Sequence, residues 1–227
     1  MLSSKKRMII RIVAGGPEQE LPDLQLLDVR GTVWIGVDRG ALYLLDRGIT
    51  PMKALGDFDS VSDKEKQKIV NAVPDHVQFP AEKDETDLEI ALTYAISKKP
   101  DAIHLYGVTG GRLDHFFGAV TLLMKDEVMN EGTTVAIIDR YNHIALYKPG
   151  RIEVEAAENE HYYSFFAMNE KVEELTLKGF KYPLVNHLLK SGSSRCVSNE
   201  IIEKKAVFSF RSGILMVIRS IDGGMNR

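Results

Sequence analysis

The sequence predicts two domains of different class: an N-terminal Rossmann-like αβα domain with a mostly parallel sheet, and a C-terminal antiparallel β-sandwich or barrel. Strand and helix patterns alternate over about the first 130 residues, which is typical of a doubly wound α/β sheet. Beyond that point, short strand patterns follow one another with polar turns between them. We therefore expect an α/β domain over residues 1–140 and an all-β domain over residues 141–227.

Four short apolar runs predict the strands of the first domain, because each of them ends at a turn signal. They occupy residues 8–13, 32–37, 52–55 and 102–106. Helix signals lie between them. An apolar helical pattern follows Gly40, and Ser62 and Thr86 each stand three residues before a glutamate, as in a capping box. A further helical face begins at Phe116.

A series of short, evenly spaced strand patterns predicts the second domain. They occupy residues 133–139, 143–148, 151–156, 162–168, 173–178, 206–211 and 214–220. Residues 182–190 interrupt this series, and their pattern is compatible with either a helix or an irregular segment.

Composition excludes several classes of protein. Hydrophobic residues make up 44% of the chain and charged residues 27%, which is ordinary for a globular protein. The net charge is −3 and the basic residues form no face or stripe, so we expect no nucleic-acid partner. No apolar run reaches the length of a membrane span, so we expect no membrane partner. The single cysteine, Cys196, fits a cytoplasmic protein.

The first candidate loop, residues 56–60, follows the third predicted strand and contains Asp57 and Asp59. Side chains two residues apart in an extended segment point the same way, so the two carboxylates would repel each other without a cation between them. Mg²⁺ takes carboxylate oxygens together with substrate phosphates as ligands. The alternative is a polar turn ahead of the helix capped by Ser62.

The second candidate loop, residues 83–89, is rich in acidic residues and opens a helix. Asp87 and Glu89 are also explained by capping and by the helix dipole. Asp84 and Lys83 lie outside that explanation. Asp84 is a candidate metal ligand, and Lys83 is a candidate point charge for a phosphate.

The third candidate loop, residues 107–115, is a glycine-rich turn before a helix. Such a turn lets backbone N–H groups approach phosphate oxygens, and Arg112 adds a rigid donor fork. The alternative is a tight turn in which Asp114 is a carboxylate at a helix start. The loop matches neither a Walker A motif nor G-x-G-x-x-G.

The three loops are expected at one edge of the sheet, because ligands of such folds bind at the carboxyl ends of the strands. Carboxylates for a metal, a lysine, an arginine and a glycine turn are the groups that phosphoryl-type transfer uses. These residues alone leave a kinase, a pyrophosphokinase, a nucleotidyl transferase and a phosphatase open.

The three motifs together resemble the thiamine pyrophosphokinase family. The matching segments are Gly56–Ser60, then Asp84-x-Thr86-Asp87, then Gly110-Gly111-Arg112-x-Asp114-His115. Val37–Ala41 resembles an Asp-Gly-Gly-Ala segment, with Arg39 where many members have glycine. In the second domain, Leu177–Tyr182 resembles a Gly-Leu-Lys-Tyr/Trp element, and Ser198–Glu200 resembles a Ser-Asn segment.

The resemblance implies an Mg²⁺-dependent enzyme of the cytoplasm that moves a diphosphate from ATP to the hydroxyl of thiamine, giving thiamine diphosphate and AMP. It also implies a homodimer with active sites at the subunit interface. The implied catalytic residues are Asp57, Asp59, Asp84, Asp87 and Arg112, and the four aspartates are also the implied metal ligands. The implied ATP-binding residues are Asp38, Arg39, Gly40, Lys83, Thr109, Gly110, Gly111, Arg112, Asp114 and His115. The implied thiamine-binding residues are Lys83, Asp87, Tyr182, Ser198 and Asn199.

The thiamine contacts have a physical basis and two alternatives. An aromatic face such as that of Tyr182 attracts a thiazolium cation by about 1 kcal/mol. Otherwise Tyr182 packs in the core and Ser198-Asn199 form a turn. A pyrophosphokinase of a pterin alcohol and a non-catalytic ligand sensor are the competing functions, and no general base stands out among Asp57, Asp84 and Asp87.

Overall fold

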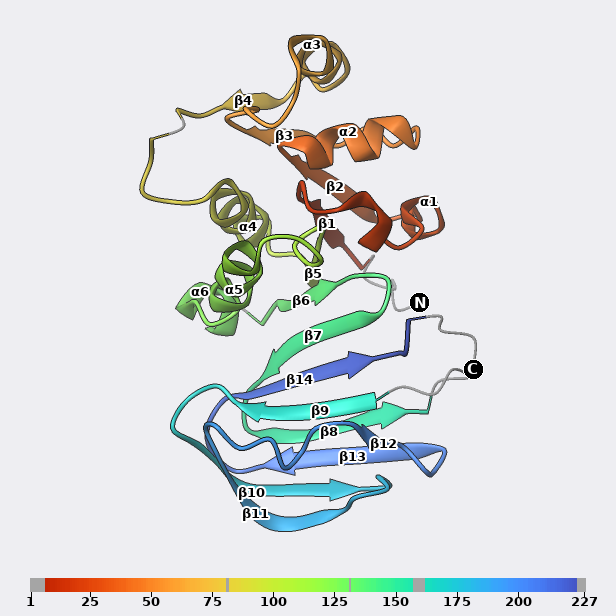
Figure 1. Ribbon diagram of the computed structural model, residues 1–227, viewed down its shortest axis with the longest axis vertical. Helices are drawn as coiled ribbons and strands as arrows, with labels where there is room; N and C mark the ends of the chain where they lie inside the picture. The colour runs from red at the N-terminus through yellow and green to blue at the C-terminus, as the bar shows by residue number, and fades with distance from the viewer. Residues whose placement is uncertain (1–6, 81, 131, 157–161, 224–227) are drawn as a thin grey trace, which may run out of the picture. The chain divides into compact units, whose positions relative to one another are not determined.

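The computed structural model of the chain describes residues 7–80, 82–130, 132–156 and 162–223 (Figure 1). The chain divides into two compact units, Met1–Arg140 and Tyr141–Arg227. The first combines helices with a parallel sheet and the second is built from antiparallel strands, so the predicted fold class is confirmed.

The first unit is organised around a parallel sheet in the strand order β6-β5-β1-β2-β3-β4. Each strand pairs in parallel with its neighbours. The strands are β1 (Ile9–Val13), β2 (Thr32–Val37), β3 (Lys53–Gly56), β4 (His76–Gln78), β5 (Ala102–Tyr106) and β6 (Thr134–Ile138). Most residues of β1, β2 and β5 are buried, as expected for a sheet covered on both faces.

Helices cover this sheet, with α1 and α2 on one side of the strands and α4 and α5 on the other (Figure 1). The helices are η1 (Glu18–Glu20), α1 (Leu24–Leu27), α2 (Arg39–Asp46), α3 (Asp63–Ala72), α4 (Asp87–Ser97), α5 (Leu113–Leu122) and α6 (Asp126–Asn130). Val13, Trp34 and Leu44 share one hydrophobic cluster, which joins the strands to α2.

The two predicted capping boxes have different outcomes. At α3 the box is complete, because the Glu65 backbone N–H donates to Ser62 Oγ and the Glu65 carboxylate accepts from the Ser62 backbone N–H. At α4, Thr86 Oγ1 accepts from the Glu89 backbone N–H at 3.2 Å, but Glu89 instead pairs with Lys125 at 2.5 Å. The Glu89 carboxylate, which the local pattern predicts for the helix cap, therefore forms an ion pair with a lysine far away in sequence.

The second unit is a sandwich of two antiparallel sheets, which decides between the predicted sandwich and barrel. The strand orders are β12-β9-β14-β7 in one sheet and β11-β10-β13-β8 in the other. The strands are β7 (Asn142–Tyr147), β8 (Gly150–Glu155), β9 (Tyr162–Ala167), β10 (Lys171–Lys178), β11 (Leu184–Lys190), β12 (Asn199–Glu200), β13 (Lys205–Phe210) and β14 (Leu215–Ser220).

The sandwich core is aromatic. Phe165 of one sheet makes edge-to-face contacts with Phe208 of the other and with Phe180, at centroid distances of 5.5 Å in both cases. All three side chains are fully buried. Such pairs add to the stabilisation that apolar burial alone supplies.

Two expectations for the strands need correction, and the short strands β4 and β12 were not predicted. The interrupting segment 182–190 was expected as helix or irregular structure, but Leu184–Lys190 form β11, which pairs with β10 across register shifts. The pattern at 133–139 was grouped with the antiparallel series, but it forms β6, which pairs in parallel with β5. Strand β4 pairs with β3 at the sheet edge.

Among the helices of the described ranges, none has both the length and the hydrophobicity needed to cross a bilayer.

Removing the ring of Phe165 should destabilise the second unit. We expect Phe165→Ala to lower the free energy of unfolding by about 3–5 kcal/mol, since it opens a cavity between the sheets. Urea denaturation followed by circular dichroism measures this change. Phe117→Ala is the matched control, because Phe117 is 65% exposed and its loss should stay within about 0.5 kcal/mol. Equal effects of the two substitutions would contradict the described core.

Candidate active site

Three aspartates meet at the carboxyl ends of the strands of the first unit. Asp38 follows β2 directly, Asp57 follows the neighbouring strand β3, and Asp87 begins α4. Because β2 and β3 are parallel neighbours, the residues after them lie at the same edge of the sheet. One carboxylate oxygen from each aspartate lies within 4.8 Å of the other two. We call these three residues the acid triad.

The backbone around Asp38 is shaped to bring its carboxylate into the triad. Asp38 has a φ of 50°, which is uncommon for a residue other than glycine. Its Oδ1 accepts a hydrogen bond from the Phe58 backbone N–H at 3.2 Å. Gly56 has a φ of 151°, and a Cβ there would lie 1.9 Å from Asp38 Oδ1. Glycine is therefore required at the end of β3.

Negative charge accumulates in the triad. Burial, together with the charges of Asp87, Asp57 and Asp59, raises the pKa of Asp38 to about 6. The N–H of Phe58 acts in the opposite direction but is outweighed. Three carboxylates at this separation are stabilised by a cation between them or by a bound proton.

Asp87 has one satisfied and one unsatisfied oxygen. Its Oδ2 pairs with Lys83 Nζ at 3.0 Å, and the two side chains are only 13% and 14% exposed. Its Oδ1 is buried and has no hydrogen-bond partner among the residues that the structure describes. A buried carboxylate oxygen without a donor requires an explanation, and a hard divalent cation supplies one. The acid triad therefore fits a magnesium-type site, with Lys83 neutralising one of its charges.

The glycine-rich loop after β5 turns back on the end of β1. Gly107 has a φ of 67°, and a Cβ there would lie 2.3 Å from the backbone oxygen of Ala14. The Gly16 backbone N–H donates to the Gly107 oxygen at 2.8 Å. The hydroxyl of Thr109 is buried and lacks a hydrogen-bond partner within the described part of the chain. The loop thus holds a second unsatisfied polar atom close to the end of a strand.

Arg112 stands at the start of α5 and is exposed. Its guanidinium holds both oxygens of Asp114, through Nε at 3.1 Å and Nη2 at 2.6 Å. This hydrogen-bonded pair lowers the pKa of Asp114 to about 2. Asp114 lies in the first turn of α5, as the alternative of a helix-start carboxylate expects, and its carboxylate also pairs with the arginine on the surface.

Several residues that the sequence analysis assigned to the metal or to ATP lie outside the acid triad. Asp59 and Asp84 are exposed, and the Asp59 backbone N–H donates to Asp57 Oδ1 at 3.0 Å. Arg39 donates to the Ser60 oxygen and pairs with Glu65 at 3.6 Å. Gly40 is buried where a Cβ would lie 1.9 Å from the Val13 oxygen, so its absence of a side chain serves packing.

Asp38 was expected among the ATP contacts, but its carboxylate lies with those of Asp57 and Asp87. The sequence holds a signal for this, because Asp38 directly follows one predicted strand and Asp57 lies just after the next one.

In the second unit, Tyr182 lies on the surface. Its side chain is 60% exposed, so the alternative that it packs in the core is wrong. Asn199 is only 2% exposed and bonds the backbone of Tyr182 twice, accepting from its N–H and donating to its oxygen, both at 2.9 Å. Ser198 has a φ of 56°, and its N–H donates to Ser164 Oγ at 3.0 Å. Asn199 thus positions the loop that presents the tyrosine ring.

The raised pKa of Asp38 predicts that the free energy of unfolding falls as the pH rises. Between about pH 4 and pH 6 the folded chain retains a proton on Asp38 that the unfolded chain, with the ordinary value of 3.8, has released. Stability from this group is therefore present below pH 4 and is lost as the pH rises to 6. We expect Asp38→Asn to raise the free energy of unfolding by about 1–2 kcal/mol at pH 7.5 and to change little at pH 4.

Urea denaturation in EDTA at both pH values measures this difference. Asp59→Asn removes a charge from an exposed side chain of the neighbouring loop and should have a small effect at either pH. A loss of stability in Asp38→Asn at pH 7.5 would contradict the described electrostatics.

Comparison with known proteins relates both units to one family. Residues 24–136 match the family described as "Thiamin pyrophosphokinase, catalytic domain", and residues 150–215 match "Thiamin pyrophosphokinase, vitamin B1 binding domain". A thiamine pyrophosphokinase of Bacillus subtilis (strain 168) is 48% identical over 213 residues, which cover 94% of this chain and 99% of the relative.

Solved structures agree with this relationship. The crystal structure of thiamine pyrophosphokinase from Bacillus subtilis superposes with a TM-score of 0.89 at 47% identity, covering 95% of this chain and all of that one. The crystal structure of the enzyme from Geobacillus thermodenitrificans gives 0.87 at 46% identity, covering 96% of this chain and 99% of that one. With both units matched and close to half of the residues identical over almost the full length, the chain belongs to the thiamine pyrophosphokinase family.

Proposed function

We propose that this chain transfers a diphosphate group from ATP to the hydroxyl group of thiamine, giving thiamine diphosphate and AMP. The observation that carries the proposal is the acid triad with its unpartnered Asp87 oxygen, in a chain of this family. Transfer from ATP requires a site that gathers phosphate charge and neutralises it. The first unit holds residues suited to both tasks.

Asp38, Asp57 and Asp87 are the residues that we propose hold Mg²⁺. They present carboxylate oxygens, which are the ligands that Mg²⁺ prefers, and their own repulsion is relieved when a cation is bound. Bound Mg²⁺ supplies charge neutralisation for the phosphate oxygens of ATP. Asp59 adds negative potential at the triad, as its effect on Asp38 indicates, and Asp84 remains a predicted member of the group.

The polyphosphate of ATP is proposed to lie between the glycine-rich loop and the triad. The exposed guanidinium of Arg112 and the hydroxyl of Thr109 are donors for its oxygens, and Lys83 carries a positive charge beside Asp87. The remaining predicted ATP contacts are Asp38, Arg39, Gly40, Gly110, Gly111, Asp114 and His115.

In the reaction, the thiamine hydroxyl oxygen forms a bond to the β-phosphorus of ATP, and its proton is released to solvent. The bond from the β-phosphorus to the oxygen that bridges to the α-phosphorus breaks, and AMP leaves with that oxygen. Positioning and charge neutralisation account for most catalysis of this kind.

Thiamine is proposed to stack on Tyr182, whose ring is exposed and held on a loop fixed by Asn199. The other predicted contacts are Ser198, Asn199, Lys83 and Asp87. An exposed ring suited to a flat cationic ligand agrees with a homodimer in which the ring completes the partner's active site. A cytoplasmic location is proposed with this activity, because ATP and magnesium are both supplied there.

The reaction itself is tested by following AMP and thiamine diphosphate formed from Mg-ATP by the purified chain. We expect equal amounts of both products, and only in the presence of thiamine. Asp57→Asn should lower kcat by at least about 100-fold, since it removes a charge from the metal ligands. Asp46→Asn, which breaks a surface ion pair with Lys68, is the control and should keep normal turnover. ADP in place of AMP would exclude diphosphate transfer.

The role of Tyr182 is tested by comparing Tyr182→Phe with Tyr182→Leu. Phenylalanine keeps the aromatic face, so the KM for thiamine should stay close to that of the original chain. Leucine loses an attraction of about 1 kcal/mol, which corresponds to a rise in KM of roughly fivefold. The KM for ATP serves as the internal control and should not change. Equal thiamine KM values for the two variants would rule out stacking on this ring.

A further inference from the structure

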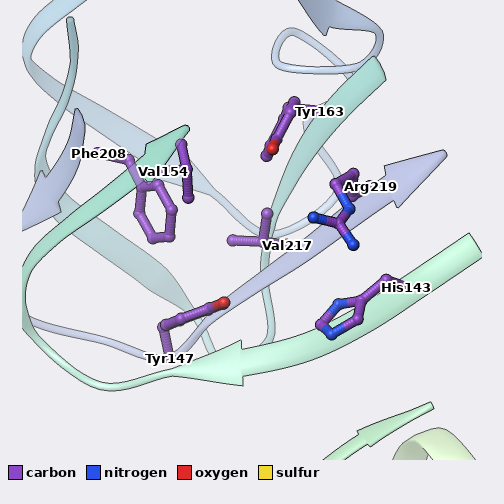
Figure 2. A pocket seen from close by; sticks show the side chains of 7 residues that line it. All are labelled: His143, Tyr147, Val154, Tyr163, Phe208, Val217 and Arg219. Carbon is purple, nitrogen blue, oxygen red and sulfur yellow. The ribbon is translucent and has the colours of Figure 1, made fainter. Parts of the chain in front are cut away.

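A small pocket that is partly open to solvent lies between the two sheets of the second unit, and Figure 2 shows the side chains that line it. Its volume is about 50 Å³. A buried water needs roughly 10–15 Å³ of such space, so the cavity has room for a group of about four or five heavy atoms. That is the size of a small inorganic ion and is far too small for a nucleotide or for thiamine.

Polar side chains line one wall of this cavity in a row across three strands. Strand pairing sets His143 of β7 opposite Arg219 of β14, and Arg219 opposite Tyr163 of β9. Tyr147 lies four residues after His143 on β7, so it projects from the same face. In Figure 2 the polar ends of these four side chains point toward the space beside Val217.

Arg219 gives the cavity a positive charge. None of the ion pairs found among the described residues involves Arg219, and no acidic side chain lines the cavity. A guanidinium carries five N–H donors in a fixed fork that matches the geometry of an oxyanion. Its charge at the cavity wall is therefore without a counterion from the described part of the protein.

The other polar groups of the row are donors as well. Burial, and after it the charge of Arg219, lowers the pKa of His143 to about 4, so its ring is neutral at pH 7 and carries one N–H. Burial raises the pKa of Tyr147, which keeps its hydroxyl protonated. Tyr163 adds a second hydroxyl and is only 4% exposed. The cavity therefore offers donors and a positive charge.

The remaining wall is apolar and consists of Val154, Phe208 and Val217. Apolar surroundings lower the local dielectric constant and strengthen the attraction between a cation and an anion. They also leave the charge of Arg219 less well solvated, and a bound anion compensates for this only where further hydrogen bonds satisfy the anion.

We propose that this cavity binds a small tetrahedral oxyanion of the phosphate type. Arg219 supplies the charge, and the hydroxyls of Tyr147 and Tyr163 with the ring N–H of His143 complete the set of donors. The site lies between the two sheets of the sandwich and shares no residue with the acid triad or with Tyr182, Ser198 and Asn199. Its occupant would link β7, β14 and β9 at one end of the sheet.

The experiment is a titration of the full chain with sodium phosphate at pH 7, followed by NMR of labelled histidine rings. Loss of one signal in His143→Gln identifies the resonance of His143, which reports on this cavity and not on the active-site region. Sodium chloride at matched ionic strength is the reference. We expect a saturable shift of the His143 signal with phosphate and none with chloride. Identical shifts with both salts would overturn the proposal.

Arg219→Met removes the charge but keeps an apolar stem, and it should weaken the phosphate response at least tenfold. Arg195→Met is the matched control, because Arg195 is exposed in the same unit and does not line the cavity. It should leave the response unchanged. An undiminished response in Arg219→Met would contradict the site.

Two milder variants cover the case in which Arg219→Met fails to fold. Tyr147→Phe and Tyr163→Phe each remove one hydroxyl and keep the ring in the core. Each should weaken phosphate binding severalfold while the unfolding transition stays cooperative. Full affinity in both variants would show that the row of donors does not hold the ion.

Discussion

Asp38, Asp57 and Asp87 hold carboxylate oxygens within 4.8 Å of one another, and much of the local structure of the first unit follows from this approach. The positive φ of Asp38 and the glycine at position 56 are both needed to bring one carboxylate beside the others. Lys83 is drawn into a largely buried pair with Asp87 by the same concentration of charge. A cluster of carboxylates opposes folding unless a cation or a bound proton neutralises part of its negative charge, so the same three residues that we propose for the metal site also affect stability.

The second unit holds polar groups in defined positions around a sandwich with an aromatic core. Asn199 is buried, and its side chain makes two hydrogen bonds to the backbone of Tyr182. These bonds hold the backbone in place while the tyrosine ring stays exposed. At the cavity, a row of donors extends from the sheet between apolar walls. At Tyr182, a buried polar group thus fixes the position of its neighbour.

Prediction worked where the signal was local. The strands at 8–13 and 102–106 follow from short apolar runs ended by turn residues, and the helix at α3 follows from a complete capping box. It failed where a partner decided the outcome. The Glu89 carboxylate was expected to complete a helix cap but pairs with Lys125. The segment at 133–139 was expected in the antiparallel series but pairs in parallel with β5. The residues of β11 carry no clear strand pattern, and the segment is a strand because it pairs with β10.

The sequence alone determined the two classes of domain, the order of the three loops and the family to which they belong, because residue types and spacings are properties of the chain itself. Only the tertiary structure decided which acids meet. Asp38 joins Asp57 and Asp87, whereas Asp59 and Asp84 remain exposed, because neighbouring parallel strands bring together residues far apart in sequence. The cavity beside Arg219 likewise exists only through strand register, since its donors come from three strands separated along the chain.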